Sequence, residues 1–245
     1  MILNKLILIT LLMFSLTAFS VRVSDEPCNS HAYLSSTSIE WEDDMEVAMT
    51  QYEMDSSSTN LYNLILQEYG LLYSSIKTKD KGLFERYESI ALDHCEQLLE
   101  QQYLKAEVAA IKSSIIGLKI AHSPWKGMFL GPKASMLIRE AMEINPESAL
   151  VQHLYANQQY FTPKIWGGSP ENAAFAYQKA IDLYQEEGMS DCWLYLDAHA
   201  WLGIVQEELG NEDQAKEVWK YIVEVSPEFA WVRDQLLPEL EESRD

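Results

Sequence analysis

Apolar residues at helical spacing fill most of this chain, and glycine and proline gather in short clusters between the helical segments. The 245 residues include only 10 glycines and 8 prolines. Between their clusters, apolar residues recur at i, i+3, i+4 and i+7, which is the period of an α-helix. No segment shows a convincing alternation of apolar and polar residues, the pattern of a β-strand. The sequence therefore predicts an all-α fold.

From Asn60 onward, the predicted helices follow one another as antiparallel pairs. A first helix, Glu40–Met54, precedes four pairs, and a terminal helix, Glu228–Glu242, follows them. The pairs are Leu61–Ile76 with Gly82–Gln101, Tyr103–Ala121 with Pro132–Ile144, Pro146–Phe161 with Pro170–Glu187, and Asp191–Leu209 with Glu212–Val225. The terminal helix is expected to cover the apolar face that the last pair would otherwise expose.

Small residues recur at intervals that indicate a repeated structural unit. Ala134, Ala173 and Ala215 occupy one position of successive second helices, and Ala141, Ala180 and Ile222 a later one. The intervals are 39 and 42 residues. A fixed helix pair with loops of variable length gives such spacing.

The segment Leu196–Phe229 is the most regular unit and has 34 residues. Its diagnostic positions are Leu202-Gly203 in the first helix, the turn Gly210-Asn211, Ala215 and Trp219 in the second helix, and Pro227 after it. In order and length this unit resembles the tetratricopeptide repeat. It departs from that pattern at His199, where a large aromatic is usual, and at Ile222, where a small residue is usual.

Two further segments, Ala134–Pro146 and Ala173–Ile181, match the second helix of the repeat more weakly. The connection Tyr160–Glu171 is similar to one found in exported bacterial tetratricopeptide proteins of unassigned function. The resemblance implies a right-handed α-α superhelix, a solenoid of about four antiparallel helix pairs plus terminal helices. It also implies that the protein binds other molecules, as tetratricopeptide proteins commonly do, but it does not identify a substrate.

Prolines at two helix boundaries lead to a local prediction. Asn145-Pro146-Glu147 and Ser226-Pro227-Glu228 each offer a capping side chain, a proline and an acid in sequence. Such a triplet favours a helix start, because proline is well tolerated at the first helical position. The sequence predicts that a new helix begins at each of these prolines.

The first twenty residues are typical of a secretory signal. Lys5 precedes an apolar run, Leu6–Phe19, and the small residues of Ala18-Phe19-Ser20 suit a signal peptidase. We expect cleavage after Ser20 and export to the periplasm or cell envelope of a bacterium; an uncleaved anchor is the alternative. Residues 21–38 are expected to form an irregular linker and residues 39–245 a single helical domain, with no membrane span after cleavage.

The net charge indicates which classes of partner the protein can bind, and the cysteines indicate whether disulfides or a metal site can form. The chain has 38 acidic and 18 basic residues, a net charge of −20. Nucleic acid and anionic membrane surfaces repel a protein of this charge, so the sequence argues against both as partners. The three cysteines, Cys28, Cys95 and Cys192, show no metal-ligand spacing, and either one pair forms a disulfide or all remain free thiols.

Two long connections, residues 122–133 and 161–171, lie at the same place in consecutive repeats and so are expected at one edge of a solenoid. The candidate ligand-binding residues there are Trp125, Lys126, Phe129, Phe161, Lys164, Trp166, Gly167 and Gly168. Backbone N–H groups of the glycine pair, ahead of a helix, would favour an anion. The alternative is that both tryptophans fold back to cover the crossing between repeats.

A second candidate surface is the concave groove between first helices, which in tetratricopeptide arrays commonly holds an extended peptide. Outward positions predicted there are Tyr155, Gln158, Asp197, Ile204 and Glu207. No nucleophile, metal-ligand or nucleotide motif is visible, so we predict no catalytic residue, no metal and no cofactor. The sequence favours a non-enzymatic scaffold with a protein, peptide or small-molecule partner; the alternative is an enzyme with an unrecognised site near the two long connections.

Overall fold

A computed structural model describes residues 28, 30–35 and 37–242. The helices are α1 (His31–Ser35), α2 (Ile39–Met54), α3 (Ser58–Thr78), α4 (Lys81–Glu100), α5 (Lys105–His122), α6 (Gly127–Ile144), α7 (Ala149–Phe161), α8 (Pro170–Glu186), α9 (Trp193–Glu208), α10 (Glu212–Val225) and α11 (Leu237–Glu242). Two 3-10 turns, η1 (Pro124–Lys126) and η2 (Lys164–Trp166), and a π-helical segment, η3 (Val232–Leu236), complete the structure. The described residues contain no strand, which confirms the all-α prediction.

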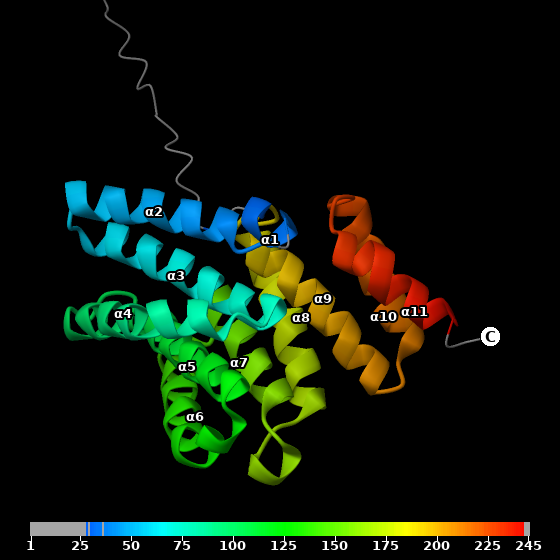
Figure 1. The fold of residues 1–245 in the computed structure, drawn as a ribbon. Coiled ribbons are helices and arrows are strands. Elements are labelled where there is room, and N and C mark those ends of the chain that lie inside the picture. Colours follow the sequence, from blue (N-terminus) through cyan, green and yellow to red (C-terminus); the bar gives the residue numbers. More distant parts are fainter. Residues whose placement is uncertain (1–27, 29, 36, 243–245) are drawn as a thin grey trace, which may run out of the picture.

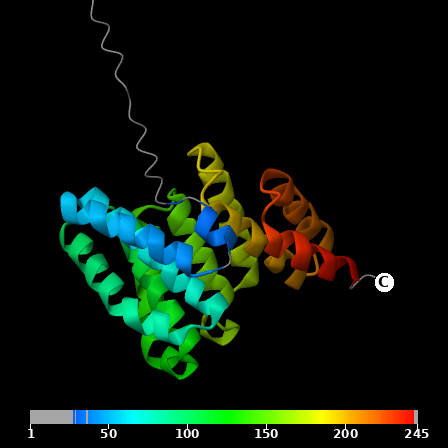
Figure 2. The same ribbon diagram turned by 45° about the horizontal axis from the view of Figure 1, so that its top comes forward.

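Helices that follow each other in the chain pack against each other, as the periodicity predicted. The consecutive pairs are α3 with α4, α5 with α6, α7 with α8, and α9 with α10. Each pair also contacts the next, so the helices form a continuous row from α2 at one side to α10 and α11 at the other (Figures 1 and 2). The signal segment 1–20 lies outside the described residues.

Polar side chains at helix starts explain several boundaries. Ser57, Asp80, Ser148 and Ser169 each accept a hydrogen bond from a backbone N–H in the first turn of α3, α4, α7 and α8. Such caps satisfy donors that have no partner inside the helix. Only α8 begins with proline directly after its cap, at Pro170.

The predicted helix starts at Pro146 and Pro227 are wrong. Asn145 and Ser226 instead follow the last residues of α6 and α10, with extended backbone at φ −143° and −130°. A residue before proline is pushed out of the helical region, so each proline ends the preceding helix. The next helix starts later, and α7 begins at Ala149 after its cap Ser148.

Two predicted irregular segments contain helices. Within residues 21–38, the chain forms the short helix α1. The connection 122–133 is mostly helical, because η1 leads directly into α6, which begins at Gly127 and contains Pro132. The predicted start of this helix at Pro132 was therefore five residues late.

Glycine allows two close helix contacts that a larger residue would prevent. A Cβ atom on Gly203 of α9 would lie 2.0 Å from Nε1 of Trp219 in α10. A Cβ atom on Gly70 of α3 would lie 2.0 Å from the ring of Trp41 in α2. Each tryptophan ring thus lies directly on the backbone of the neighbouring helix.

The N-terminal helices are fastened to α9 far along the chain. Cys28 and Cys192 form a disulfide, and the N–H of Trp193 donates to the carbonyl of Cys28 at 3.0 Å. The buried ring of Trp193 packs against Tyr33, Trp41, Tyr69 and Tyr73, with centroids 5.3 to 5.9 Å apart. Of the alternatives left open by the sequence, the structure has the disulfide, and Cys95 is a buried free thiol.

Candidate binding surfaces and a buried polar network

The two long connections lie at the same end of the molecule. Both occur at the lower end of the helix row in Figures 1 and 2. A side-chain hydrogen bond of 3.3 Å from Gln158 in α7 to Ser135 in α6 joins the helices next to them. We call the residues of these connections, Trp125–Lys133 and Phe161–Trp166, the loop edge.

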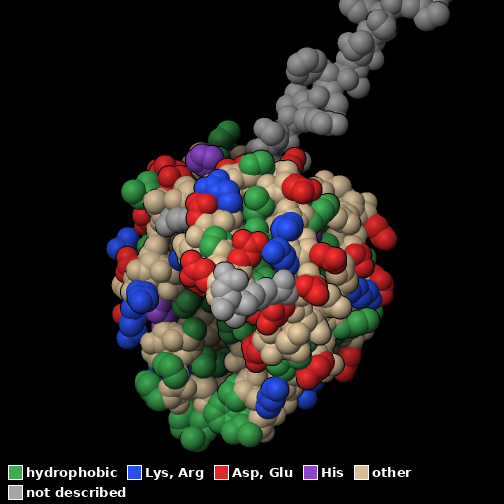
Figure 3. All heavy atoms as spheres, turned by 90° about the vertical axis from the view of Figure 1, so that its right-hand side faces the viewer, with side chains coloured by type: hydrophobic (Ala, Val, Ile, Leu, Met, Phe, Trp, Pro, Cys, Tyr) green, Lys and Arg blue, Asp and Glu red, His purple; other side chains and the backbone are tan. Residues whose placement is uncertain are grey.

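Large apolar side chains of the loop edge project into solvent. Trp125, Phe129 and Trp166 are 72%, 72% and 61% exposed, and Phe161 is 57% exposed. Met128 and Ile165, which sequence reasoning did not select, are 71% and 85% exposed. Figure 3 shows apolar side chains gathered at this lower end of the molecule. Contrary to the alternative considered above, the two tryptophans do not cover a crossing between repeats.

Local contacts hold the first connection in place. Ser123 is buried after α5, and the N–H of Lys126 donates to its carbonyl at 2.9 Å. His122 lies against the ring of Phe84 and within 2.9 Å of the Ser75 hydroxyl. Burial lowers the pKa of His122. The anchored backbone leaves Trp125 outside, with the Lys126 ammonium 5.7 Å from its ring centre.

The predicted anion cradle at Gly167 and Gly168 is absent from this loop. Its N–H groups are used internally: Gly167 donates to Lys164 O at 3.1 Å, Gly168 to Pro163 O at 3.3 Å. The glycines serve the tight loop instead. Gly167 has φ +96°, and a Cβ atom on Gly168 would lie 1.7 Å from a backbone oxygen.

Only part of the predicted groove faces outward. Glu207 is exposed, and Tyr155, Gln158 and Ile204 are half-buried. Asp197 is 1% exposed, so its predicted outward position is wrong. It is buried because α1 and α3 lie against this part of α9, as the contacts of Tyr33 and Tyr73 show.

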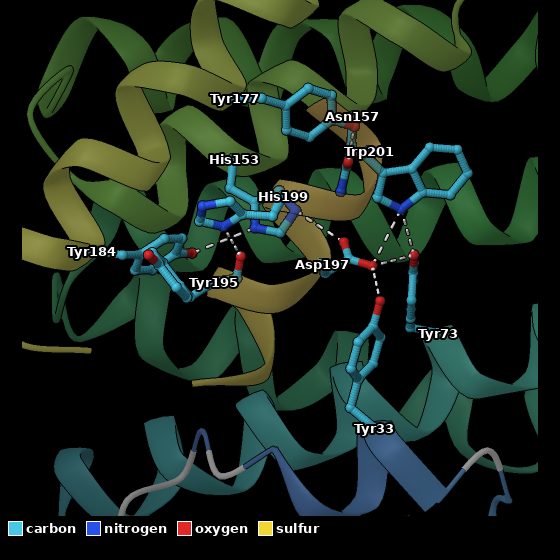
Figure 4. A network of polar contacts seen from close by, with 10 residues as sticks. All are labelled: Tyr33, Tyr73, His153, Asn157, Tyr177, Tyr184, Tyr195, Asp197, His199 and Trp201. Atoms are coloured by element: carbon cyan, nitrogen blue, oxygen red, sulfur yellow. Dashed lines mark hydrogen bonds and ion pairs between the residues drawn. The ribbon is translucent and has the colours of Figure 1, made fainter. Parts of the chain in front are cut away.

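Asp197 is the acceptor at the centre of a buried polar network (Figure 4). One carboxylate oxygen accepts from the hydroxyls of Tyr33 and Tyr73, both at 2.8 Å, and from the Trp201 indole at 3.2 Å. The other oxygen lies 3.0 Å from Nε2 of His153. The donors come from α1, α3, α7 and α9, so this carboxylate joins four helices.

The network has the chemistry of a structural element. His153 and Asp197 are 0% and 1% exposed, so no substrate can reach the pair. Burial, followed by the charge of Asp197, raises the pKa of the Tyr33 and Tyr73 hydroxyls well above its usual value, so both remain donors. Paired donors offset the large cost of burying a carboxylate. Sequence reasoning missed this network because its members are up to 164 residues apart.

A second buried pair lies between α3 and α4. Nδ1 of His94 is 2.8 Å from Oε1 of Glu68, whose side chain is 2% exposed. The hydrogen bond to Glu68 raises the pKa of His94, and burial raises the pKa of Glu68. Sequence reasoning selected neither residue, because the neighbours of His94 in its helix point in other directions and Glu68 belongs to no recognised motif.

A surface hollow of about 650 Å³ lies next to Asp191, which adjoins Cys192 of the disulfide. Its lining includes His31, Asp44, Asp191 and Glu228. Within the described residues, no group of histidine, cysteine and acidic side chains has the arrangement needed to hold a metal ion.

Comparison of the sequence with protein-family models and with curated proteins finds no match. None of the helices in the described part of the chain is both long enough and apolar enough to cross a membrane.

Proposed function

We propose that this protein is a non-enzymatic binding scaffold of the cell envelope, and that it holds its partner at the loop edge. The observation that carries the proposal is the exposure of Trp125, Met128, Phe129, Ile165 and Trp166, all above 60%. Exposed apolar side chains gathered at one end of a molecule are typical of an interaction site. Buried tryptophan and phenylalanine contribute strongly to binding, which is a reason for such residues to be held at a surface.

A tetratricopeptide-like superhelix is the architecture that we propose for the scaffold. The successive packed helix pairs and the Gly203–Trp219 contact support it. Export is supported by the signal-like pattern of residues 1–20 and by the Cys28–Cys192 disulfide, a type of bond that persists in oxidising compartments. A scaffold is preferred to an enzyme because the His153–Asp197 pair is closed off from solvent.

The half-buried groove positions are a secondary contact surface in this proposal. Tyr155 in α7 and Ile204 in α9 are half-buried, and Glu207 in α9 is exposed. This mildly acidic surface would suit a basic or polar peptide segment. The loop edge has the larger exposed apolar area and is the surface to test first.

Site-specific photocrosslinking in exporting cells tests the proposal. A photoreactive phenylalanine analogue replaces Phe129 or Trp166, and we expect discrete adducts on irradiation because both positions face the partner. Val47 and Met54 in α2, which are 58% and 84% exposed, are the matched control positions. Equal adduct patterns from loop-edge and control positions, or no adduct from the loop edge, would contradict the proposal.

A further inference from the structure

The loop edge combines exposed apolar side chains with an unusual local charge. No Asp or Glu occurs between Glu107 and Glu140, although the chain has 38 acidic residues. Five basic residues lie in that stretch. Lys112 and Lys119 are paired with glutamates of α4, but Lys133 and Arg139 are exposed.

The second connection repeats this combination. Lys164 is exposed next to Ile165 and Trp166 in η2. Glu171 is the only acid in residues 159–175. Hydrogen bonds from its own backbone N–H and from the Ser169 hydroxyl, the latter at 2.8 Å, lower the pKa of its carboxyl group, and Lys164 adds a smaller effect in the same direction. Each connection thus carries lysine close in sequence to its exposed apolar residues, and Lys126 lies 5.7 Å from the ring centre of Trp125.

From these features we infer that the loop edge binds the headgroup region of a bilayer that contains anionic phospholipids. The inference rests on the proposed function, because it names the partner of the same surface. Tryptophan rings favour the boundary between headgroups and acyl chains. Phe129 and Ile165 would enter the apolar layer, while Lys126, Lys133 and Lys164 would reach the lipid phosphates through their flexible stems.

The shape and the charge favour a bilayer over a second copy of this chain. Exposed fractions of 61% to 85% belong to projecting side chains, and Figure 3 shows that apolar side chains gather at the lower end of the molecule. A symmetric contact between two copies would bring the lysines of each loop edge together. The net negative charge, which argued against anionic membranes from the sequence alone, does not prevent the contact, because charges beyond about 8 Å are largely screened at physiological ionic strength.

Co-sedimentation with unilamellar vesicles tests the inference. The mature chain is mixed with vesicles of phosphatidylcholine alone or of phosphatidylcholine and phosphatidylglycerol in equal parts. We expect binding to the anionic vesicles that weakens with added salt. The variant with Lys126, Lys133 and Lys164 all changed to Gln should partition about a hundredfold less, because each lysine near an anionic surface contributes about fivefold.

A variant with Trp125→Ser and Trp166→Ser should lose at least about tenfold in partitioning, because both rings would leave the interface. The matched control, Val47→Ser with Met54→Ser, removes exposed apolar side chains from α2 and should bind as the wild type does. Absence of wild-type binding to anionic vesicles, equal binding by the tryptophan variant, or a dimer that depends on these tryptophans would overturn the inference.

The outcomes separate this inference from the proposed function. A discrete protein adduct at Phe129 in cells, without any vesicle binding, would contradict the inference of a bilayer partner and would still support a binding scaffold. Failure of both the crosslinking and the vesicle binding would remove both proposals.

Discussion

At the residue scale, the Asp197 carboxylate is the most connected polar group of the core. Four side chains direct donor atoms at its two oxygens, and these side chains come from helices at both ends of the chain. A buried charge of this kind stabilises a fold only while its donors remain in place. Removing either side of the network leaves polar groups buried without partners.

We therefore expect Asp197→Ala to lower the free energy of unfolding by about 3 to 5 kcal/mol, a large part of the stability of a typical domain. Tyr33→Phe removes one hydrogen bond to a charged acceptor and should cost about 1.5 to 3 kcal/mol. Tyr103→Phe is the matched control, because its hydrogen bond to Thr59 is exposed. Urea unfolding measures all three, and an Asp197→Ala cost no larger than that of Tyr103→Phe would contradict this account.

His199 makes the fold sensitive to acid. Burial lowers its pKa from 6.5 to about 4, although its hydrogen bond to the Tyr195 carbonyl opposes the change. The unfolded chain therefore binds a proton between pH 6.5 and 4 that the folded chain does not. Stability is expected to fall with decreasing pH in this window, by up to about 1.4 kcal/mol per pH unit.

His199→Phe should flatten the stability profile between pH 6.5 and 4, because phenylalanine cannot take up a proton. The ring can still stack on Tyr221, whose centroid lies 5.5 Å from that of His199. Unfolding free energies at several pH values measure the effect. A profile that keeps its full slope in the variant would show that other groups cause the acid sensitivity.

At the scale of elements, the closeness of α9 and α10 depends on Gly203. An added Cβ atom would meet the Trp219 ring, which is fully buried and donates to the Ala200 carbonyl at 3.1 Å. The ring has no free space into which it can move. The contact is local in sequence, which is why the spacing of Leu202-Gly203 and Trp219 could predict it.

Gly203→Ala is expected to destabilise the protein by about 1 to 3 kcal/mol through overpacking. Gly117→Ala in α5 is the matched control, because a Cβ atom there would meet nothing within 4 Å. That change should stabilise the fold by about 0.5 to 1 kcal/mol through higher helix propensity. Melting temperatures that shift in the same direction for both variants would contradict the packing argument.

Helix existence and pairing followed from periodicity, whereas helix starts depended on local backbone chemistry. The sequence placed starts at Pro146 and Pro227, but each proline ended the previous helix because it restricts the residue before it. The triplets around these two prolines were compatible with both the start of a new helix and the end of the preceding one. Among the starts that the sequence placed at a proline, the one at Pro170, where Ser169 caps the helix directly, was correct.

At the scale of the whole molecule, the sequence could not predict which surfaces are covered. Asp197 looked outward on an isolated helix, but helices that precede it by more than 120 residues bury it. The sequence was compatible with either location for the loop-edge tryptophans, because the composition of the two connections suits both a packed loop and an exposed one. Local periodicity does not reveal contacts between residues that are far apart in the sequence. The sequence could therefore locate the candidate site only approximately.

The disulfide fastens the first helices to the start of α9, with 164 residues between its cysteines. Cys28→Ser with Cys192→Ser should therefore lower the free energy of unfolding by about 2 to 5 kcal/mol. Cys95→Ser changes a buried thiol outside any disulfide and controls for the loss of a sulfur atom. Urea unfolding under non-reducing conditions measures the difference, and equal stability of the double variant and the wild type would contradict the tethering role.

The central claim is that the loop-edge tryptophans are held outside the core for contact with another molecule. The unfolding free energy of the Trp125→Ala, Trp166→Ala double variant tests it most directly. Because both rings are more than 60% exposed, we expect a value within about 1 kcal/mol of the wild type. A loss of about 6 kcal/mol or more, as for two buried tryptophans, would show that these side chains belong to the core and would contradict the claim.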